Sequence, residues 1–467
     1  MKDFFSFEER STSLRTELSA GITTFFTMAY VIFVNPGILS AAGVPFAAAA
    51  TSTALGAAVM CITMGFVTNR PLALASGMGI NAALAFSVIG FNQSHVPWQV
   101  GMSVVFIEGV VILVLVLTGF REAVMDAIPI NLKRAIGVGI GLFITFIGLN
   151  DGGIIRPDPV TLVSLGDFSQ KYVWVTLIGL ISIAAFESFR LKGAILMGLV
   201  TATASAWLLG ITALPSGIAG DPDVSAFFAP FQHVDGHLAI VKVISPALLA
   251  AVFAFMLTDF FDAMGTVLAV GEQAGFVDKS GRVPGIRNIL AVDSMAAAVG
   301  GLFGASSITT YVESSAGVAQ GGRTGLTAIV TGILFALSAF FAPVIRMIGG
   351  GYSLPDSQHY ALFADSGMPV PHGDYRVYPI TAGALIVVGF LMIGIVRDME
   401  WDSFEEAFPA FLTIVGIPLT YNISYGIGFG FISYTLIKMI KGRFGNVRPL
   451  LYGMSMAFLI AFILTAL

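Results

Sequence analysis

One long apolar run has at its centre the sequence Leu257-Thr258-Asp259-Phe260-Phe261-Asp262-Ala263-Met264-Gly265-Thr266. The run extends from about Val243 to Val270 and is long enough to cross a lipid bilayer as a helix. Asp259 and Asp262 are three residues apart, so a helix places both carboxyl groups on one face. A charge near the bilayer centre costs about 2.5–3.5 kcal/mol on insertion scales, and such residues usually mark a substrate or ion path. The stretch therefore predicts such a path inside a membrane protein.

A second acid, Glu313, follows about fifty residues later in the sequence Ser306-Ser307-Ile308-Thr309-Thr310-Tyr311-Val312-Glu313-Ser314-Ser315-Ala316-Gly317. The hydroxyl groups around Glu313 suit a half-helix that begins near Thr309. Such a half-helix directs its backbone N–H groups toward the middle of the bilayer. We expect the two acidic stretches to meet in one site.

The composition is that of a polytopic membrane protein. Of the 467 residues, 56% are hydrophobic and 11% are charged, whereas soluble domains carry about 25% charged residues. The single cysteine, Cys61, excludes an intrachain disulfide and a cysteine-based metal cluster. The ATP-binding motif G-x-x-x-x-G-K-S/T does not occur. We therefore expect no metal, no cofactor and no nucleic-acid partner.

About twenty apolar residues cross a bilayer as a helix, so apolar runs of about this length predict the membrane segments. The segments 72–89 and 309–320 are short and interrupted by Gly and Ser, so we expect half-helices preceded by extended chain. The predicted segments are 18–38, 47–68, 72–89, 97–119, 131–149, 171–188, 191–212, 243–271, 288–304, 309–320, 325–348, 378–397, 404–418, 421–440 and 447–466.

The distribution of Lys and Arg predicts the orientation. Basic residues concentrate on the cytoplasmic side of membrane proteins, which places the N-terminus, with Arg10 and Arg15, in the cytoplasm. Fourteen segments precede Lys441 on this reading. The last run, 447–466, is either an additional helix or a segment along the membrane surface, so the side of the C-terminus stays open.

The segments divide into two halves of seven, and in each half the third segment is the interrupted one. Because seven is odd, the second half begins on the opposite side of the membrane, which makes the halves an inverted repeat. Interrupted segments at matching positions indicate the binding site of a transporter. In the first half this segment carries Asn81, whose amide can bind a polar ligand or cap the half-helix.

No Lys or Arg is predicted near the middle of a span, so Asp259 and Asp262 have no evident cationic partner. A buried carboxyl group in that situation can take up a proton on one side of the membrane and release it on the other. We expect Asp262 to face the ligand, because Gly265 opens space one turn later. Two further intramembrane acids, Glu108 and Asp293, are expected to tie helices together.

These motifs resemble the nucleobase–cation symporter-2 (nucleobase/ascorbate transporter) family, and within it the adenine/guanine/hypoxanthine permease branch. The resemblance covers nearly the whole chain. It rests on the stretches 258–266 and 309–317, on residues 17–31 and 409–414, and on the sequence Gly77-Met78-Gly79-Ile80-Asn81-Ala82.

The resemblance implies an all-α fold of fourteen transmembrane segments in two inverted repeats of seven, with a core domain that moves against a gate domain. The core would comprise residues 15–120 and 243–349, and the gate residues 121–215 and 376–467. The implied function is import of adenine, guanine or hypoxanthine by proton symport, with Na+ not excluded and no enzymatic activity. A homodimer in a bacterial inner membrane is also implied.

The same resemblance assigns substrate contacts to Asp262 in segment eight, Glu313 in segment ten and Asn81 in segment three. Asp259 stands where relatives can have Asn, which leaves its charge and role open. Carboxylates accept N–H bonds, and an amide both donates and accepts, so the set suits the edges of a purine. The candidates for proton coupling are Asp262, Glu313 and Asp259. The further candidate substrate-binding residues are Thr310, Tyr311 and Ser314.

Other interpretations remain. The sequence distinguishes a xanthine or uracil carrier of the same fold only weakly from a carrier of adenine, guanine or hypoxanthine. An anion carrier of this architecture would need a positive site, and a channel would need rings of repeated pore residues, whereas this chain has acids in both central segments. An intramembrane enzyme would need a metal site or a nucleophile pair, and the sequence shows neither.

Overall fold

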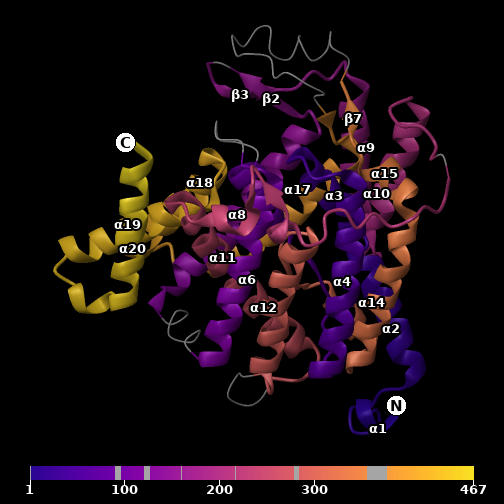
Figure 1. Ribbon diagram of the computed structural model, residues 1–467, viewed down its shortest axis with the longest axis horizontal. Coiled ribbons are helices and arrows are strands. Elements are labelled where there is room, and N and C mark those ends of the chain that lie inside the picture. Colours follow the sequence, from indigo (N-terminus) through magenta and orange to yellow (C-terminus); the bar gives the residue numbers. More distant parts are fainter. Residues whose placement is uncertain are drawn as a thin grey trace.

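The computed structural model describes residues 2–89, 96–119, 127–158, 160–215, 217–277, 283–354 and 376–466. Within these residues the chain is mainly helical, with four two-stranded sheets. Figure 1 shows long helices running up and down the molecule, with the N-terminus at one end and the β2–β3 hairpin at the other. Ten helical stretches among the described residues are long and apolar enough to cross a membrane.

The helices are α1 (Lys2–Phe5), α2 (Leu14–Met28), α3 (Val31–Ala41), α4 (Phe46–Thr68), α5 (Met78–Ala83), α6 (Trp98–Thr118), α8 (Ile130–Asp151), α9 (Lys171–Ser188), α10 (Ala194–Leu208), α11 (Pro246–Gln273), α12 (Ile286–Phe303), α13 (Ser314–Ala319), α14 (Gly325–Ser338), α15 (Ala342–Gly349), α17 (Pro379–Ile393), α18 (Phe404–Thr420), α19 (Ile423–Ile440) and α20 (Pro449–Ala466). The strands are β1 (Leu74–Ser76), β2 (Ile155–Asp158), β3 (Leu162–Leu165), β4 (His233–Val234), β5 (His237–Leu238), β6 (Ile308–Thr310), β7 (Tyr352–Ser353) and β8 (Arg376–Val377).

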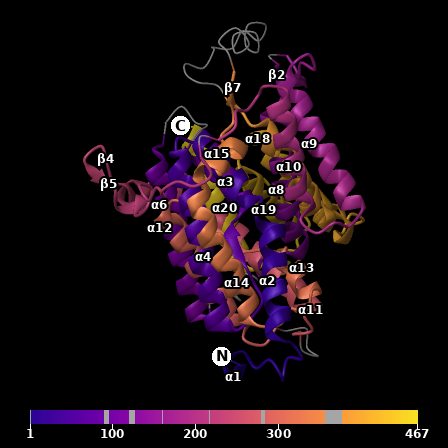
Figure 2. The same cartoon turned by 90° about the vertical axis from the view of Figure 1, so that its right-hand side faces the viewer.

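The helices form two groups. In the first group α4 packs against α14 and α12, α6 packs against α12, and α2 packs against α14. In the second group α8 packs against α17 and α18, α9 against α10 and α17, and α18 against α19. Figure 2 shows α4, α6 and α12 on one side of the molecule and α8, α9 and α10 on the other. The groups have the arrangement of a core and a gate, and α11 contacts both.

Glycines bring the helices of the first group into backbone contact. A Cβ atom added to Gly325 of α14 would lie 2.0 Å from the carbonyl oxygen of Gly65 in α4. A Cβ atom on Gly109 of α6 would lie 2.2 Å from the backbone nitrogen of Ala298 in α12. Small residues permit this approach in a bilayer, where helix association depends on close packing more than on water exclusion.

Most predicted segments correspond to helices, but one detail of the prediction is wrong. Residue Thr309 lies in β6, and the following helix α13 begins only at Ser314, because residues 308–310 pair with β1. The first segment, predicted over 18–38, lies within one apolar span, Leu14–Ala41, that α2 and α3 form together.

Three other predictions concern the C-terminal run, the number of segments and one domain boundary. The run 447–466 forms the helix α20 over most of its length. The exact count of fourteen segments stays a prediction, and the predicted boundary between residues 120 and 121 lies outside the described residues.

We expect Gly325→Ala to lower the stability of the purified protein, because the added methyl group would overlap the Gly65 carbonyl oxygen. Overpacking of this kind costs about 1–3 kcal/mol. Thermal unfolding in detergent would show a melting temperature several degrees lower. Gly453→Ala in α20 is the matched control, since its Cβ atom would meet nothing within 4 Å. Equal melting temperatures for the two variants would contradict the assigned packing.

Candidate functional site

The site is organised around two strands that pair in the middle of the first helix group. β1 and β6 are antiparallel, with Leu74 opposite Thr310 and Ser76 opposite Ile308. The pairing continues beyond the strands, because the Tyr311 N–H donates to Ala73 (3.0 Å) and the Gly77 N–H donates to the carbonyl oxygen of Ser307 (2.8 Å). Extended backbone at membrane depth is tolerated only where its polar groups are satisfied by protein or water. Each strand satisfies the other here.

Side chains add further bonds to this crossing. The Ala73 N–H donates to the Ser314 hydroxyl oxygen (2.9 Å), and the Ser76 hydroxyl donates to the carbonyl oxygen of Ala305 (2.8 Å). The Tyr311 hydroxyl donates to the carbonyl oxygen of Ser76. Hence Tyr311 and Ser314, both predicted to bind substrate, also connect β6 and α13 to the β1 segment.

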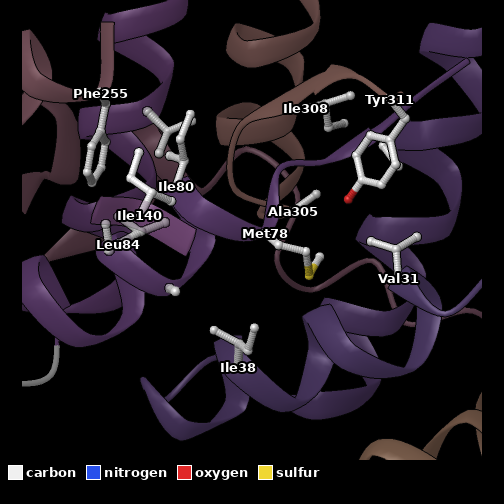
Figure 3. Close-up of a cluster of buried hydrophobic side chains, with 14 of the residues drawn as sticks. Val31, Ile38, Met78, Ile80, Leu84, Ile140, Phe255, Ala305, Ile308 and Tyr311 are labelled. Carbon is white, nitrogen blue, oxygen red and sulfur yellow. The ribbon is translucent and has the colours of Figure 1, made fainter. Parts of the chain in front are cut away.

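Apolar side chains enclose the crossing. Figure 3 shows Met78, Ala305 and Tyr311 near one another where the extended segments meet, with Val31 of α3 beside them. Ile80, Ile140 and Phe255 form a second cluster, contributed by α5, α8 and α11. The crossing therefore lies in a dry environment, where an unsatisfied polar group is costly.

The two aspartates of α11 have different environments. Asp259 is buried, with 1% of its surface exposed. Asp262 is exposed, and it lies on a face of α11 that continues through the exposed residues Gly265, Ala269 and Glu272. A Cβ atom on Gly265 would meet nothing within 4 Å, so the space beside this face is open. Of the two acids, Asp262 is thus the one beside open space, as the position of Gly265 predicted, and its contact with a ligand stays a prediction.

Glu313 stands immediately before α13 and is half-buried. Its carboxylate accepts a hydrogen bond from the hydroxyl of Tyr30 at 2.9 Å. Asp262 is near enough to Glu313 for the two charges to interact. The structure therefore brings the acids of α11 and of the α13 entrance together, as the two acidic stretches predicted. Tyr30 was missed by the sequence reasoning, because it lies at the break between α2 and α3 that hydropathy does not reveal.

Asp293 of α12 supports the β6 strand from behind. Its Oδ1 atom accepts two hydrogen bonds, one from the Thr310 N–H (2.8 Å) and one from the Thr309 hydroxyl (3.2 Å). Glu108 of α6 is fully buried and within electrostatic reach of Asp293. Asp293 thus connects α12 to β6, which confirms the expectation that it ties elements together.

Asn81 is fully buried in α5, and its amide nitrogen donates to the Oδ1 of Asn35 at 2.5 Å. Asn35 in turn donates to Thr53 (2.8 Å) and to the carbonyl oxygen of Ala305 (3.2 Å). The sequence reasoning did not identify Asn35. Its signal was a lone amide in an apolar helix immediately before Pro36.

The remaining candidates have the following places. The Thr310 backbone is bound by Asp293, while its hydroxyl has no hydrogen-bond partner among the described residues. The roles of Thr310, Tyr311 and Ser314 toward a ligand stay predictions. Within the described part of the chain no group of three or more His, Cys, Asp or Glu side chains could hold a metal ion.

Solved structures share this architecture. The transmembrane domain of the cyanobacterium bicarbonate transporter BicA matches with a TM-score of 0.59 and 16% identity, covering 88% of this chain and 97% of that one. The murine anion transporter Slc26a9 in the inward-facing state matches with a TM-score of 0.58 and 10% identity, covering 92% of this chain and 69% of that one. At such identities the likeness concerns the fold alone. The long helices and the paired half-helices define a polytopic membrane fold with a core and a gate.

Sequence comparison defines the family. Residues 15–350 match the model Xan_ur_permease, described as "Permease family". The guanine/hypoxanthine permease PbuO of Bacillus subtilis is 39% identical, with 98% of this chain and 99% of that protein covered. The adenine permease AdeP of Escherichia coli is 37% identical, with 98% and 94% covered. The chain belongs to this permease family, the nucleobase–cation symporter-2 family that its motifs resemble.

We expect Ser314→Ala to destabilise the crossing, because the buried Ala73 N–H would lose its acceptor. A buried donor left unsatisfied costs about 1–3 kcal/mol. The measurement is thermal unfolding in detergent, with Ser315→Ala, a half-buried neighbour, as the control. If Ser314→Ala were as stable as Ser315→Ala, the bond to Ala73 would not contribute to the fold.

Proposed function

We propose that this protein carries purine nucleobases across the membrane by symport with protons. The observation that carries the proposal is the meeting of Asp262 and Glu313 at the β1–β6 crossing, in a chain similar over nearly its whole length to permeases named for guanine, hypoxanthine and adenine. The substrate class comes from those relatives. The site provides the chemistry that such a substrate requires.

Purines present N–H donors along their edges, and the site offers acceptors. The carboxylates of Asp262 and Glu313 can each accept N–H bonds, and charge-assisted bonds of this kind are the stronger ones. The carboxamide of Asn81 adds an acceptor oxygen that has no hydrogen-bond partner among the described residues. A site of this kind rejects analogues that leave its buried polar groups unpaired.

The proximity of the acids supports the proposed proton coupling. Two neighbouring carboxylates repel each other when both are ionised, and a proton bound to one removes the repulsion. Asp262 is exposed and can exchange a proton with solvent, whereas Glu313 is half-buried and held by Tyr30. Asp262 and Glu313 are thus the proposed coupling residues, with Asp259 as a third candidate one turn away.

Alternating access would occur by movement of the core against the gate. The exposed face of α11 runs from Asp262 to Glu272, and just beyond it Phe276 lies under the guanidinium groups of Arg10 and Arg70 at 5.8 and 4.2 Å. This end of α11 therefore lies beside the N-terminal segment, and with the N-terminus in the cytoplasm, as proposed, it is the cytoplasmic end.

Other parts of the proposal come from the family resemblance. They are the core at residues 15–120 and 243–349, the gate at 121–215 and 376–467, a homodimer, and a place in a bacterial inner membrane. Chemical cross-linking in membranes measures the oligomeric state directly.

The proposal is tested by uptake of radiolabelled adenine, guanine, hypoxanthine, xanthine and uracil in bacterial cells lacking their own carriers. We expect uptake of one or more of the first three, and its loss in Asp262→Asn and Glu313→Gln, because each substitution removes a charged acceptor. The loss of one such bond alone lowers affinity about 10- to 100-fold. Glu187→Gln is the control, since Glu187 is an exposed acid at the end of α9.

Membrane levels of each variant are measured by immunoblot. Uptake like that of the native protein in either site variant would refute the assigned roles. Preferential uptake of xanthine or uracil would replace the proposed substrate class.

We also expect uphill purine accumulation to depend on an inward proton gradient. In membrane vesicles energised by an imposed pH step, a protonophore should reduce accumulation to the level of equilibration. The same assay with an imposed Na+ gradient at constant pH is the control. Accumulation that survives the protonophore and follows the Na+ gradient would assign the coupling to Na+ instead.

A further inference from the structure

We infer that Asn35 fixes the orientation of the Asn81 carboxamide, so that Asn81 presents its oxygen to the ligand and selects a purine edge that carries an N–H donor. The inference rests on the proposed function and extends it, because it names a residue outside the acidic pair that determines specificity. It depends on which group donates and which accepts in the hydrogen bonds that link four elements of the core.

The direction of the hydrogen bonds is set first by backbone carbonyl groups, which can only accept. The Thr53 hydroxyl donates to the carbonyl oxygen of Ala49 at 2.6 Å, so its oxygen is left to accept from Asn35 Nδ2 at 2.8 Å. The same Nδ2 donates to the carbonyl oxygen of Ala305 at 3.2 Å. A rotated Asn35 amide would place an oxygen against this carbonyl oxygen. The nitrogen of Asn35 must therefore face Thr53 and Ala305.

The fixed orientation of the Asn35 amide then determines the orientation of the Asn81 amide. With its nitrogen committed, Asn35 offers Oδ1 on the other side, and Asn81 Nδ2 donates to it at 2.5 Å. Rotating the Asn81 amide would bring two oxygens together, so this orientation is also fixed. Asn81 Oδ1 remains, buried and without a hydrogen-bond partner among the described residues. A buried polar atom without a partner requires an explanation, and an N–H group of a bound ligand supplies one.

The relay is connected to the crossing itself. The carbonyl oxygen of Ala305, which fixes Asn35, also accepts from the Ser76 hydroxyl at 2.8 Å. Ser76 ends β1 one residue before the cap of α5, and its own carbonyl oxygen accepts from Tyr311. α5, which carries Asn81, also contacts α11, which carries Asp262.

The consequence is a third fixed acceptor in addition to the two carboxylates. Unlike a carboxylate, an amide free to rotate could offer either N–H or oxygen and would accept both kinds of purine edge. Because Asn35 fixes the Asn81 amide in one orientation, Asn81 can offer only its oxygen to the ligand. An analogue that places a ring acceptor opposite Asn81 meets oxygen against a lone pair and is rejected.

The test measures inhibition of labelled hypoxanthine uptake by two analogues. In 6-methoxypurine, N1 can only accept, and in 9-methylhypoxanthine the N9 hydrogen is replaced by a methyl group. We expect the native protein to bind at least one of them 10-fold or more less tightly than hypoxanthine. In Asn35→Ala the Asn81 amide is free to rotate and can donate to N1 of 6-methoxypurine, so discrimination against this analogue should fall about 10-fold. Discrimination against the other analogue should not change.

Asn35→Asp is the matched control. A protonated aspartic acid keeps one acceptor for Asn81 and one donor for Ala305, so its discrimination should equal that of the native protein. Discrimination in Asn35→Ala identical to that of the native protein would overturn the inference. Absence of purine uptake by the native protein would instead refute the proposed function, and the inference would fail with it.

A second pair of variants applies if Asn35→Ala does not reach the membrane. Asn81→Asp in its protonated form donates to Asn35 Oδ1 and keeps an acceptor toward the ligand, whereas Asn81→Leu has neither group. We expect Asn81→Asp to retain the native order of inhibition and Asn81→Leu to lose at least 10-fold in affinity for hypoxanthine. Equal affinities in these two variants would overturn the inference.

Discussion

The pairing of β1 with β6 is the constraint on which the rest of the structure depends. Two segments far apart in sequence leave the helical conformation inside an apolar core, and neither could do so alone, because lipid offers no hydrogen bonds. Their mutual bonds permit α5 and α13 to begin inside the core, and the same segments place Asn81 and Glu313 there. Asp293 and Ser314 serve the same pairing with side-chain bonds. The polar site therefore exists because the fold first satisfies the interrupted backbone.

Local signals in the sequence were sufficient to predict much of this arrangement. Apolar run length identifies the long helices, and the Gly- and Ser-broken runs identify the interrupted segments. The acids were found by their cost in lipid, a property of single residues that needs no knowledge of neighbours. Asp262 and Glu313 were therefore accessible from the sequence, and so was their meeting, through the matching positions of their segments in the two halves.

Features that depend on contacts between distant residues were not accessible. The start of α13 at Ser314 instead of Thr309 follows from the register with β1, which no local pattern encodes. Tyr30 and Asn35 become site residues only when α3 is packed on the crossing. In sequence Tyr30 is one residue between two apolar helices, and Asn35 is a single amide within one. The positions of costly residues are thus readable, whereas the partners that orient them are not.

The two kinds of polar group in the site suit different tasks. Asp262 lies on an open face and can change its protonation state as the surroundings change. Asn81 cannot titrate, and its bonds end on backbone carbonyl groups, so its hydrogen-bonding character is the same in every protonation state of the acids. A carrier that couples substrate to protons needs both: acids whose charge alters during the cycle, and a neutral group that recognises the substrate at each stage. Because Asn81 lies in α5, directly after the paired strand β1, recognition by Asn81 in the proposed function would not depend on the charge of the acids.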